Sequence, residues 1–304
     1  MPAIRSFHNG ALLLAMALGV GLAACQRPPA PASSTSAAPP PPAAATRPAQ
    51  AVQLLTRHLR DNDLEAFARD AIPPDLHAQL EAAWTAGRTR WPLDELPFDD
   101  RLPGMLAGLS APGAEARLQR TFDQQFAHAP VQIKGAAVSL GLFGARYIAG
   151  QGDFSDDERQ HYAQLIQAAS RWAASAPLSD AARARASITA LATAARASRL
   201  ASAADFSAVG LDESLRRIGG FERVVKQVLA RYGLDLDADL AGLRATLQQQ
   251  TGDGARVRMQ YRFAGQDIDA VVSVQRVEGH WYVSDFLRHA RAAVAAPAMP
   301  ATTR

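Results

Sequence analysis

The chain has 304 residues, of which 48% are hydrophobic and 20% are charged, so it is long enough for one sizeable hydrophobic core or two modest ones. Lysine and arginine number 32 against 29 acidic residues, and a formal charge of +3 gives no argument for nucleic-acid binding. The single cysteine excludes a disulfide framework, a four-cysteine zinc site and a CxxC redox pair, because each needs at least two thiols.

Residues 1–24 have the pattern of an export signal. Arg5 supplies the positive charge near the N-terminus, and an apolar run from Ala11 to Gly21 follows it. At 1.5 Å of rise per residue, roughly, this run is too short to cross about 30 Å of hydrocarbon as a helix. The pattern therefore predicts a signal peptide that is removed.

The end of this segment, Leu22, Ala23, Ala24 and Cys25, resembles the bacterial lipobox. The resemblance implies that Cys25 receives a diacylglyceryl group and becomes the N-terminus of a membrane-anchored protein. An ordinary cleavage site is the alternative, which Leu22 fits poorly. In the sorting rule of such lipoproteins, an aspartate after the cysteine favours the inner membrane. Gln26 therefore implies the outer membrane, with the body facing the periplasm, over the inner membrane.

Residues 25–50 are rich in Pro and Ala and include an unbroken proline run, Pro39–Pro42. Such a segment cannot bury a core and favours an extended polyproline II conformation. It predicts a disordered tether between the anchor and the body.

A 3.6-residue apolar period dominates residues 51–250 and predicts a helical region. Ser155 and Glu158 have the spacing of a capping box at the start of one helix. Residues 131–150 are apolar, but Lys134 and Arg146 interrupt them, which favours a buried core helix over a membrane span. Within it we interpret Gly141 and Gly144 as close-packing positions. A last helix is predicted over residues 238–249.

At residues 252–254 the apolar period changes from 3.6 to 2, which predicts a half-buried antiparallel strand. The apolar positions of this strand are Val257, Met259, Tyr261 and Phe263. A predicted turn at Gly265 and Gln266 places Phe263 opposite Ile268, Met259 opposite Val272, Val257 opposite Val274, and Arg262 opposite Asp269.

A second turn at Glu278 and Gly279 places Val274 opposite Val283 and brings Trp281 onto the inner face. The predicted class is α+β, predominantly α-helical, with a small C-terminal three-stranded antiparallel meander in residues 251–290. Because the meander has an apolar face to cover, we expect it to form one unit with residues 51–250. Residues 291–304 are predicted to be a disordered tail.

The segment 278–286 resembles the last strands of NTF2-like or cystatin-like domains of bacterial lipoproteins, and residues 54–67 resemble the first helices of that fold. The resemblance implies that the two ends of the body meet, with a large helical insertion between about residues 75 and 250. It implies a fold only, because no functional residue in this family is diagnostic.

Sequence motifs for catalysis are missing. No GxSxG or HExxH occurs, and Asp235, Asp237 and Asp239 lack the Gly and Glu that a calcium loop needs. We therefore predict no catalytic, cofactor or metal site. The acids Asp94, Glu95, Asp99 and Asp100 leave an envelope hydrolase as the weakest alternative.

Charge is unevenly distributed, with acids in excess over residues 51–180 and bases in excess over residues 181–231. On the helix predicted over residues 180–200, Arg185, Arg196 and Arg199 share one edge, which we call the basic edge. It either lies against the acidic helices of the same chain or contacts an anionic partner.

These observations favour a non-enzymatic, lipid-anchored protein of the outer membrane that presents a binding surface to another envelope protein. An inhibitor or immunity protein is one form of this function. The alternative is a carrier of an apolar ligand, with a pocket lined by Met259, Tyr261, Phe263 and Trp281. The same four residues are also explained as ordinary core.

Overall fold

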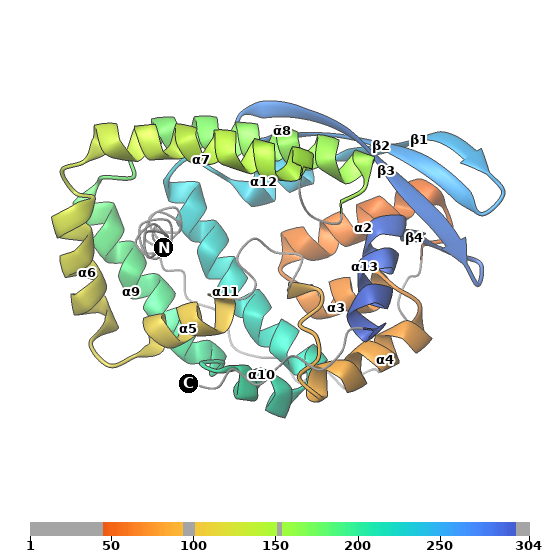
Figure 1. The fold of residues 1–304 in the computed structure, drawn as a ribbon, viewed down its shortest axis with the longest axis horizontal. Coiled ribbons are helices and arrows are strands. Elements are labelled where there is room, and N and C mark those ends of the chain that lie inside the picture. Colours follow the sequence, from red (N-terminus) through yellow and green to blue (C-terminus); the bar gives the residue numbers. More distant parts are fainter. Residues whose placement is uncertain (1–44, 94–100, 151–153, 296–304) are drawn as a thin grey trace, which may run out of the picture.

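The computed structural model describes residues 45–93, 101–150 and 154–295 of the chain (Figure 1). The helices are α2 (Pro48–Asp61), α3 (Leu64–Asp70), α4 (Pro74–Thr85), α5 (Leu102–Ser110), α6 (Ala114–Gln125), α7 (Pro130–Gly150), α8 (Asp156–Ser175), α9 (Ala181–Ser198), α10 (Ala203–Val209), α11 (Leu211–Arg231), α12 (Leu236–Ala241) and α13 (Ser284–Ala295). The strands are β1 (Arg244–Thr251), β2 (Gly254–Phe263), β3 (Gln266–Val277) and β4 (His280–Val283). The fold is α+β and mostly helical, as predicted, but the sheet has four strands rather than three.

The sheet is antiparallel with its strands in chain order, β1-β2-β3-β4. In β2, Ala255, Val257 and Met259 are buried and the residues between them are exposed, as the two-residue period predicts. Val274 pairs with Val283, so the predicted second turn is confirmed.

The predicted first turn is wrong by one position. The turn residues are Ala264 and Gly265, both with positive φ (52° and 77°), which suits a two-residue hairpin. Phe263 therefore pairs with Gln266, and the carboxylate of Asp239 accepts a hydrogen bond from the Ala264 N–H at 3.0 Å.

This turn shifts each predicted pairing along β3 by two residues. The pairs are Tyr261 with Ile268, Met259 with Ala270, Val257 with Val272, and Arg262 with Asp267. Because side chains alternate with period two, the shift leaves every residue on its predicted face.

The prediction of a helix over residues 238–249 is also wrong, since β1 begins at Arg244 and α12 has already ended at Ala241. All side chains of β1 except Ala245 are exposed, so no buried face marks this strand in the sequence. Its support is backbone pairing to β2, from Arg244 opposite Gln260 to Thr251 opposite Gly254.

Both ends of the described body are more ordered than the sequence predicts. Ala45 is buried and its carbonyl accepts a hydrogen bond from the Trp281 N–H at 2.8 Å, while α2 starts at Pro48, inside the predicted tether. At the other end β4 stops at Val283, and α13 continues to Ala295, beyond the predicted start of the tail. Leu287 and Ala290 of α13 are fully buried, which holds this helix in the core.

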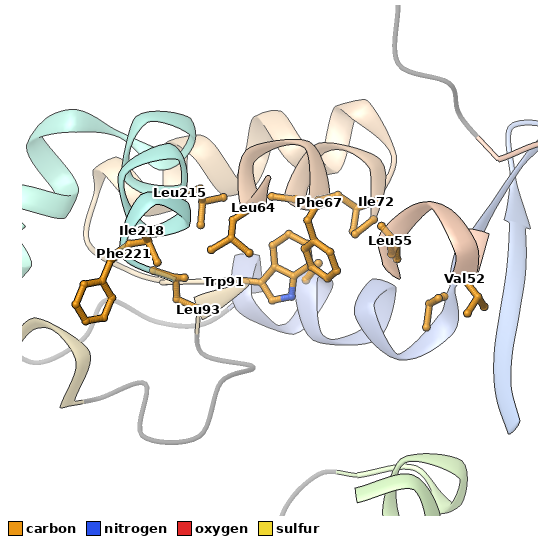
Figure 2. Close-up of a cluster of buried hydrophobic side chains, with 14 of the residues drawn as sticks. Val52, Leu55, Leu64, Phe67, Ile72, Trp91, Leu93, Leu215, Ile218 and Phe221 are labelled. Atoms are coloured by element: carbon orange, nitrogen blue, oxygen red, sulfur yellow. The ribbon is translucent and has the colours of Figure 1, made fainter. Parts of the chain in front are cut away.

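One continuous cluster of buried apolar side chains joins the helices to the sheet. Figure 2 shows part of it, where side chains of α2, α3 and α11 gather near Trp91. The buried indoles of Trp84 and Trp172 are satisfied, because their Nε1–H groups donate to the carbonyls of Phe206 and Tyr232 at 2.9 Å each.

Helix α7 is not the buried core helix that its composition predicts. It lies beside α8 along one margin of the molecule (Figure 1), and only Ile133, Ala137 and Ile148 are buried. The interpretation of its glycines as close-packing positions is confirmed. A Cβ at Gly141 would lie 2.4 Å from the Ser170 hydroxyl, and one at Gly144 would lie 3.2 Å from Ile166.

Candidate functional site

A cavity of about 280 Å³ lies between the inner face of the sheet and helices α2, α8 and α13. Its walls are mostly apolar, and its polar groups come from α8, β2 and the start of α13. The apolar walls include Leu55, Leu59, Leu165, Met259, Val272 and Phe286, and the polar groups include Glu158, His161, Tyr261 and Asp285.

Local contacts fix the position of α8 beside the sheet. The predicted capping box is confirmed: the Ser155 hydroxyl accepts from the Glu158 N–H at 3.2 Å, and the Ser155 N–H donates to the Glu158 carboxylate at 2.7 Å. The carboxylate of Asp157 accepts hydrogen bonds from Arg256 at 2.8 Å and from Ser273 at 3.0 Å. These contacts hold the first turn of α8, with its polar side chains, at the cavity.

His161 and Tyr261 join the helix side of the cavity to the sheet side. Nε2 of His161 lies 2.6 Å from the Tyr261 hydroxyl. Burial lowers the pKa of His161 to about 4, and burial also raises the pKa of Tyr261 above its ordinary value of 10.0. Both side chains are therefore uncharged at neutral pH, and they share one hydrogen bond whose direction depends on the histidine tautomer.

Two carboxylates, Glu158 and Asp285, form a second polar group at the cavity. Nη2 of Arg288 donates to Glu158 at 2.6 Å and to Asp285 at 3.2 Å, and the Ser155 hydroxyl donates to Asp285 at 3.1 Å. Both residues are buried, and burial raises the pKa of Glu158. The guanidinium offsets their charge, which lowers the cost of keeping them away from water.

The pair of His161 and Tyr261 suits the binding of a ligand better than the transfer of a proton. With a pKa of about 4, His161 is a weak base at neutral pH, and Tyr261 holds its proton more firmly than a free tyrosine. Within the described part of the chain, no group of three or more His, Cys, Asp or Glu side chains is placed to hold a metal ion.

The predicted pocket residues separate into two pairs. Met259 and Tyr261 line the cavity. Phe263 and Trp281 lie outside its lining: Phe263 packs against the core, and the Trp281 ring is buried with the Arg276 guanidinium 5.8 Å from its centre.

The basic edge is partly used within the chain. Arg196 forms an ion pair with Glu115 of α6, so this arginine contacts an acid of the same chain, which is the first of the two interpretations given above for the basic edge. Arg185 is exposed on α9, and Arg199 is exposed at the C-cap of that helix. Cys25 and the acids at positions 94, 95, 99 and 100 lie outside the described residues.

Sequence reasoning missed His161, Glu158 and Asp285 as site residues. Glu158 was assigned to capping alone, and it does cap α8 while also facing the cavity. No local pattern pairs His161 with Tyr261, because the two residues are 100 positions apart in the sequence. A signal was present: His161 lies three residues after Glu158, and so on the same face of α8.

Comparison of the chain with protein-family models, curated proteins and solved structures finds no match. A search of the described helices for one with the length and hydropathy of a membrane span also finds none.

Proposed function

We propose that the cavity binds a small, largely apolar molecule that carries one uncharged hydrogen-bonding group. The observation that supports this most is the half-buried His161 and Tyr261 pair in a cavity whose walls are mostly apolar. Ligand sites are commonly apolar pockets with a few convergent polar groups, and those groups often have perturbed pKa values.

The charges around the cavity narrow the ligand class. Glu158 and Asp285 share the single guanidinium of Arg288, so an anionic ligand group would meet carboxylates and find no free counter-charge. The pair of His161 and Tyr261 offers hydrogen bonds to a hydroxyl or carbonyl group without any net charge. A volume of about 280 Å³ suits a compact ligand rather than a long acyl chain.

Filling the cavity should abolish ligand binding without unfolding the protein. Val272 lines the cavity and is only half-buried, so Val272→Trp places an indole in the space that the ligand would occupy. We expect a panel of apolar alcohols and ketones to raise the melting temperature of the wild-type protein, and we expect that shift to disappear in the variant.

Leu247→Trp is the matched control, because Leu247 is exposed on β1 and does not line the cavity. It should retain the ligand-induced shift. If no probe stabilises the wild-type protein, or if both variants keep the shift, the cavity is not the binding site.

We also propose that the body is held at the periplasmic face of the outer membrane by acylated Cys25, with Gln26 disfavouring the inner membrane. A second function, docking of an envelope protein on the basic edge, has weaker support, because Arg196 already pairs with Glu115 and leaves Arg185 and Arg199.

The native mass of the full-length protein, extracted with detergent from its own host, tests the anchor and the second function together. We expect a chain that starts at Cys25 and carries the mass of acyl chains. A protein bound at fixed stoichiometry, and lost in Arg185→Glu with Arg199→Glu, would support the docking function. A mature chain without acyl mass would contradict the anchor.

A further inference from the structure

Helix α7 presents an unusual apolar surface. Among the described residues, the large hydrophobic side chains that are exposed are Val131, Val138, Leu140, Leu142, Phe143, Tyr147 and Leu247, and all but the last belong to α7. Val131 is 77% exposed, and Leu142 and Phe143 are each 71% exposed. Clusters of this kind on a protein surface usually mark a site of contact with a partner or a membrane.

Packing explains why these side chains face outward. The glycine side of α7 lies against α8, where Gly141 and Gly144 approach Ser170 and Ile166, and the Ser170 hydroxyl donates to the Ala137 carbonyl at 3.0 Å. In Figure 1 the two helices run side by side at the margin of the fold. A mostly apolar helix that packs on one side only leaves the apolar side chains of its other side to be covered from outside.

The charges on α7 indicate what covers it. The helix contains Lys134 and Arg146 and no acidic residue. Phe143 and Tyr147, one turn apart, add the aromatic side chains that settle at the boundary of lipid headgroups and acyl chains. Apolar side chains accompanied only by cations match a bilayer that contains anionic lipids.

We propose that the exposed face of α7 lies on the surface of the membrane that holds the anchor. Ala45 comes twenty positions after Cys25, and at about 3.1 Å per residue such a proline-rich segment reaches roughly 60 Å. The body is thus confined near the bilayer, where a weak interfacial contact suffices to orient it. This proposal uses the acylation of Cys25 but not the proposed ligand cavity.

A single-site fluorescent label tests the contact. Because acylation consumes Cys25, Leu142→Cys gives the mature full-length chain one free thiol, which takes an environment-sensitive dye. We expect a quencher carried on the lipid acyl chains to reduce its emission several-fold more than that of a Thr193→Cys label, which occupies an exposed position on α9. The vesicles should contain phosphatidylethanolamine and phosphatidylglycerol. Lys134→Glu with Arg146→Glu should weaken the quenching at position 142.

Three results would overturn the proposal. Equal quenching at positions 142 and 193 would show that α7 does not contact the lipid. A label at position 142 that is shielded in native membranes but not in pure-lipid vesicles would assign α7 to a protein partner. Two labels per mature chain would show that Cys25 is not acylated, which removes the anchor that the proposal requires.

Discussion

Replacing Gly219 with alanine is expected to lower the free energy of unfolding by about 3 kcal/mol. A Cβ at this position of α11 would lie 2.3 Å from the backbone oxygen of Asn62, far inside van der Waals contact. Asn62 is the C-cap of α2, with φ of 59°, and its N–H is bonded to the Leu59 carbonyl. The corner between α2 and α3 therefore has little freedom to move away. Urea unfolding followed by circular dichroism measures the loss.

Gly220→Ala is the control at the next position. In the described part of the chain, no atom outside the adjacent turns of α11 lies within 4 Å of a Cβ built there, and the residue is inside α11. Alanine has a higher helix propensity than glycine, so we expect Gly220→Ala to leave the free energy of unfolding unchanged or raise it by up to about 1 kcal/mol. Equal stability of the two variants would mean that α11 does not approach the corner at Asn62 as closely as the structure indicates.

The strands that the sequence predicted correctly are those with one buried face. In β2 the alternation of Ala255, Val257 and Met259 with charged residues reflects a face that packs on the core. In β1 nearly every side chain is exposed, and the spacing of Leu240, Leu243 and Leu247 resembles a helical period. Its backbone pairing to β2 decides its conformation, and pairing leaves no pattern in side-chain polarity.

The error at the first hairpin has a different cause. Glycine in the first turn position suggested a turn at Gly265 and Gln266, whereas the chain turns one residue earlier, through Ala264 with positive φ. Alanine rarely adopts this conformation. The hydrogen bond from its N–H to Asp239, which comes from α12, is a tertiary contact that no local pattern records.

Helix α7 shows the limit of composition as evidence of burial. An apolar helix with two charges was interpreted as core, yet in the described structure one side of it contacts α8 and the opposite side is exposed. An apolar composition indicates that a helix surface avoids water, but it does not indicate which part of the chain or which partner covers that surface. The cavity shows a similar limit. The contact between His161 and Tyr261 depends on α8 crossing the sheet, and the sequence alone does not report that arrangement.

Lys226→Met is expected to lower the free energy of unfolding by about 4 kcal/mol. The side chain is only 5% exposed, and its ammonium group donates to the carbonyls of Leu59 and Arg60 at the end of α2. It also forms an ion pair with Asp237 at 3.1 Å. Methionine fills similar space but removes the ammonium donor, which leaves the Leu59 and Arg60 carbonyls with only the longer hydrogen bonds from Asn62, at 3.3 Å and 3.4 Å. Lys134→Met, at the only other lysine and exposed on α7, is the control and should cost almost nothing.

The pH dependence of Lys226→Met distinguishes loss of this charge from loss of packing. Burial raises the pKa of Glu222 from its ordinary 4.5 to about 7, and Lys226 opposes that shift. The folded protein therefore keeps the Glu222 proton longer than the unfolded chain, and stability falls as pH rises from about 4.5 to about 7. Without Lys226 the pKa of Glu222 rises further, so in the variant the fall should continue to higher pH. A parallel pH profile in both proteins would contradict a role for the ammonium charge.

Lys226→Met should also weaken binding of the proposed ligand. Leu55 and Leu59 of α2 line the cavity, and the variant loosens the end of this helix.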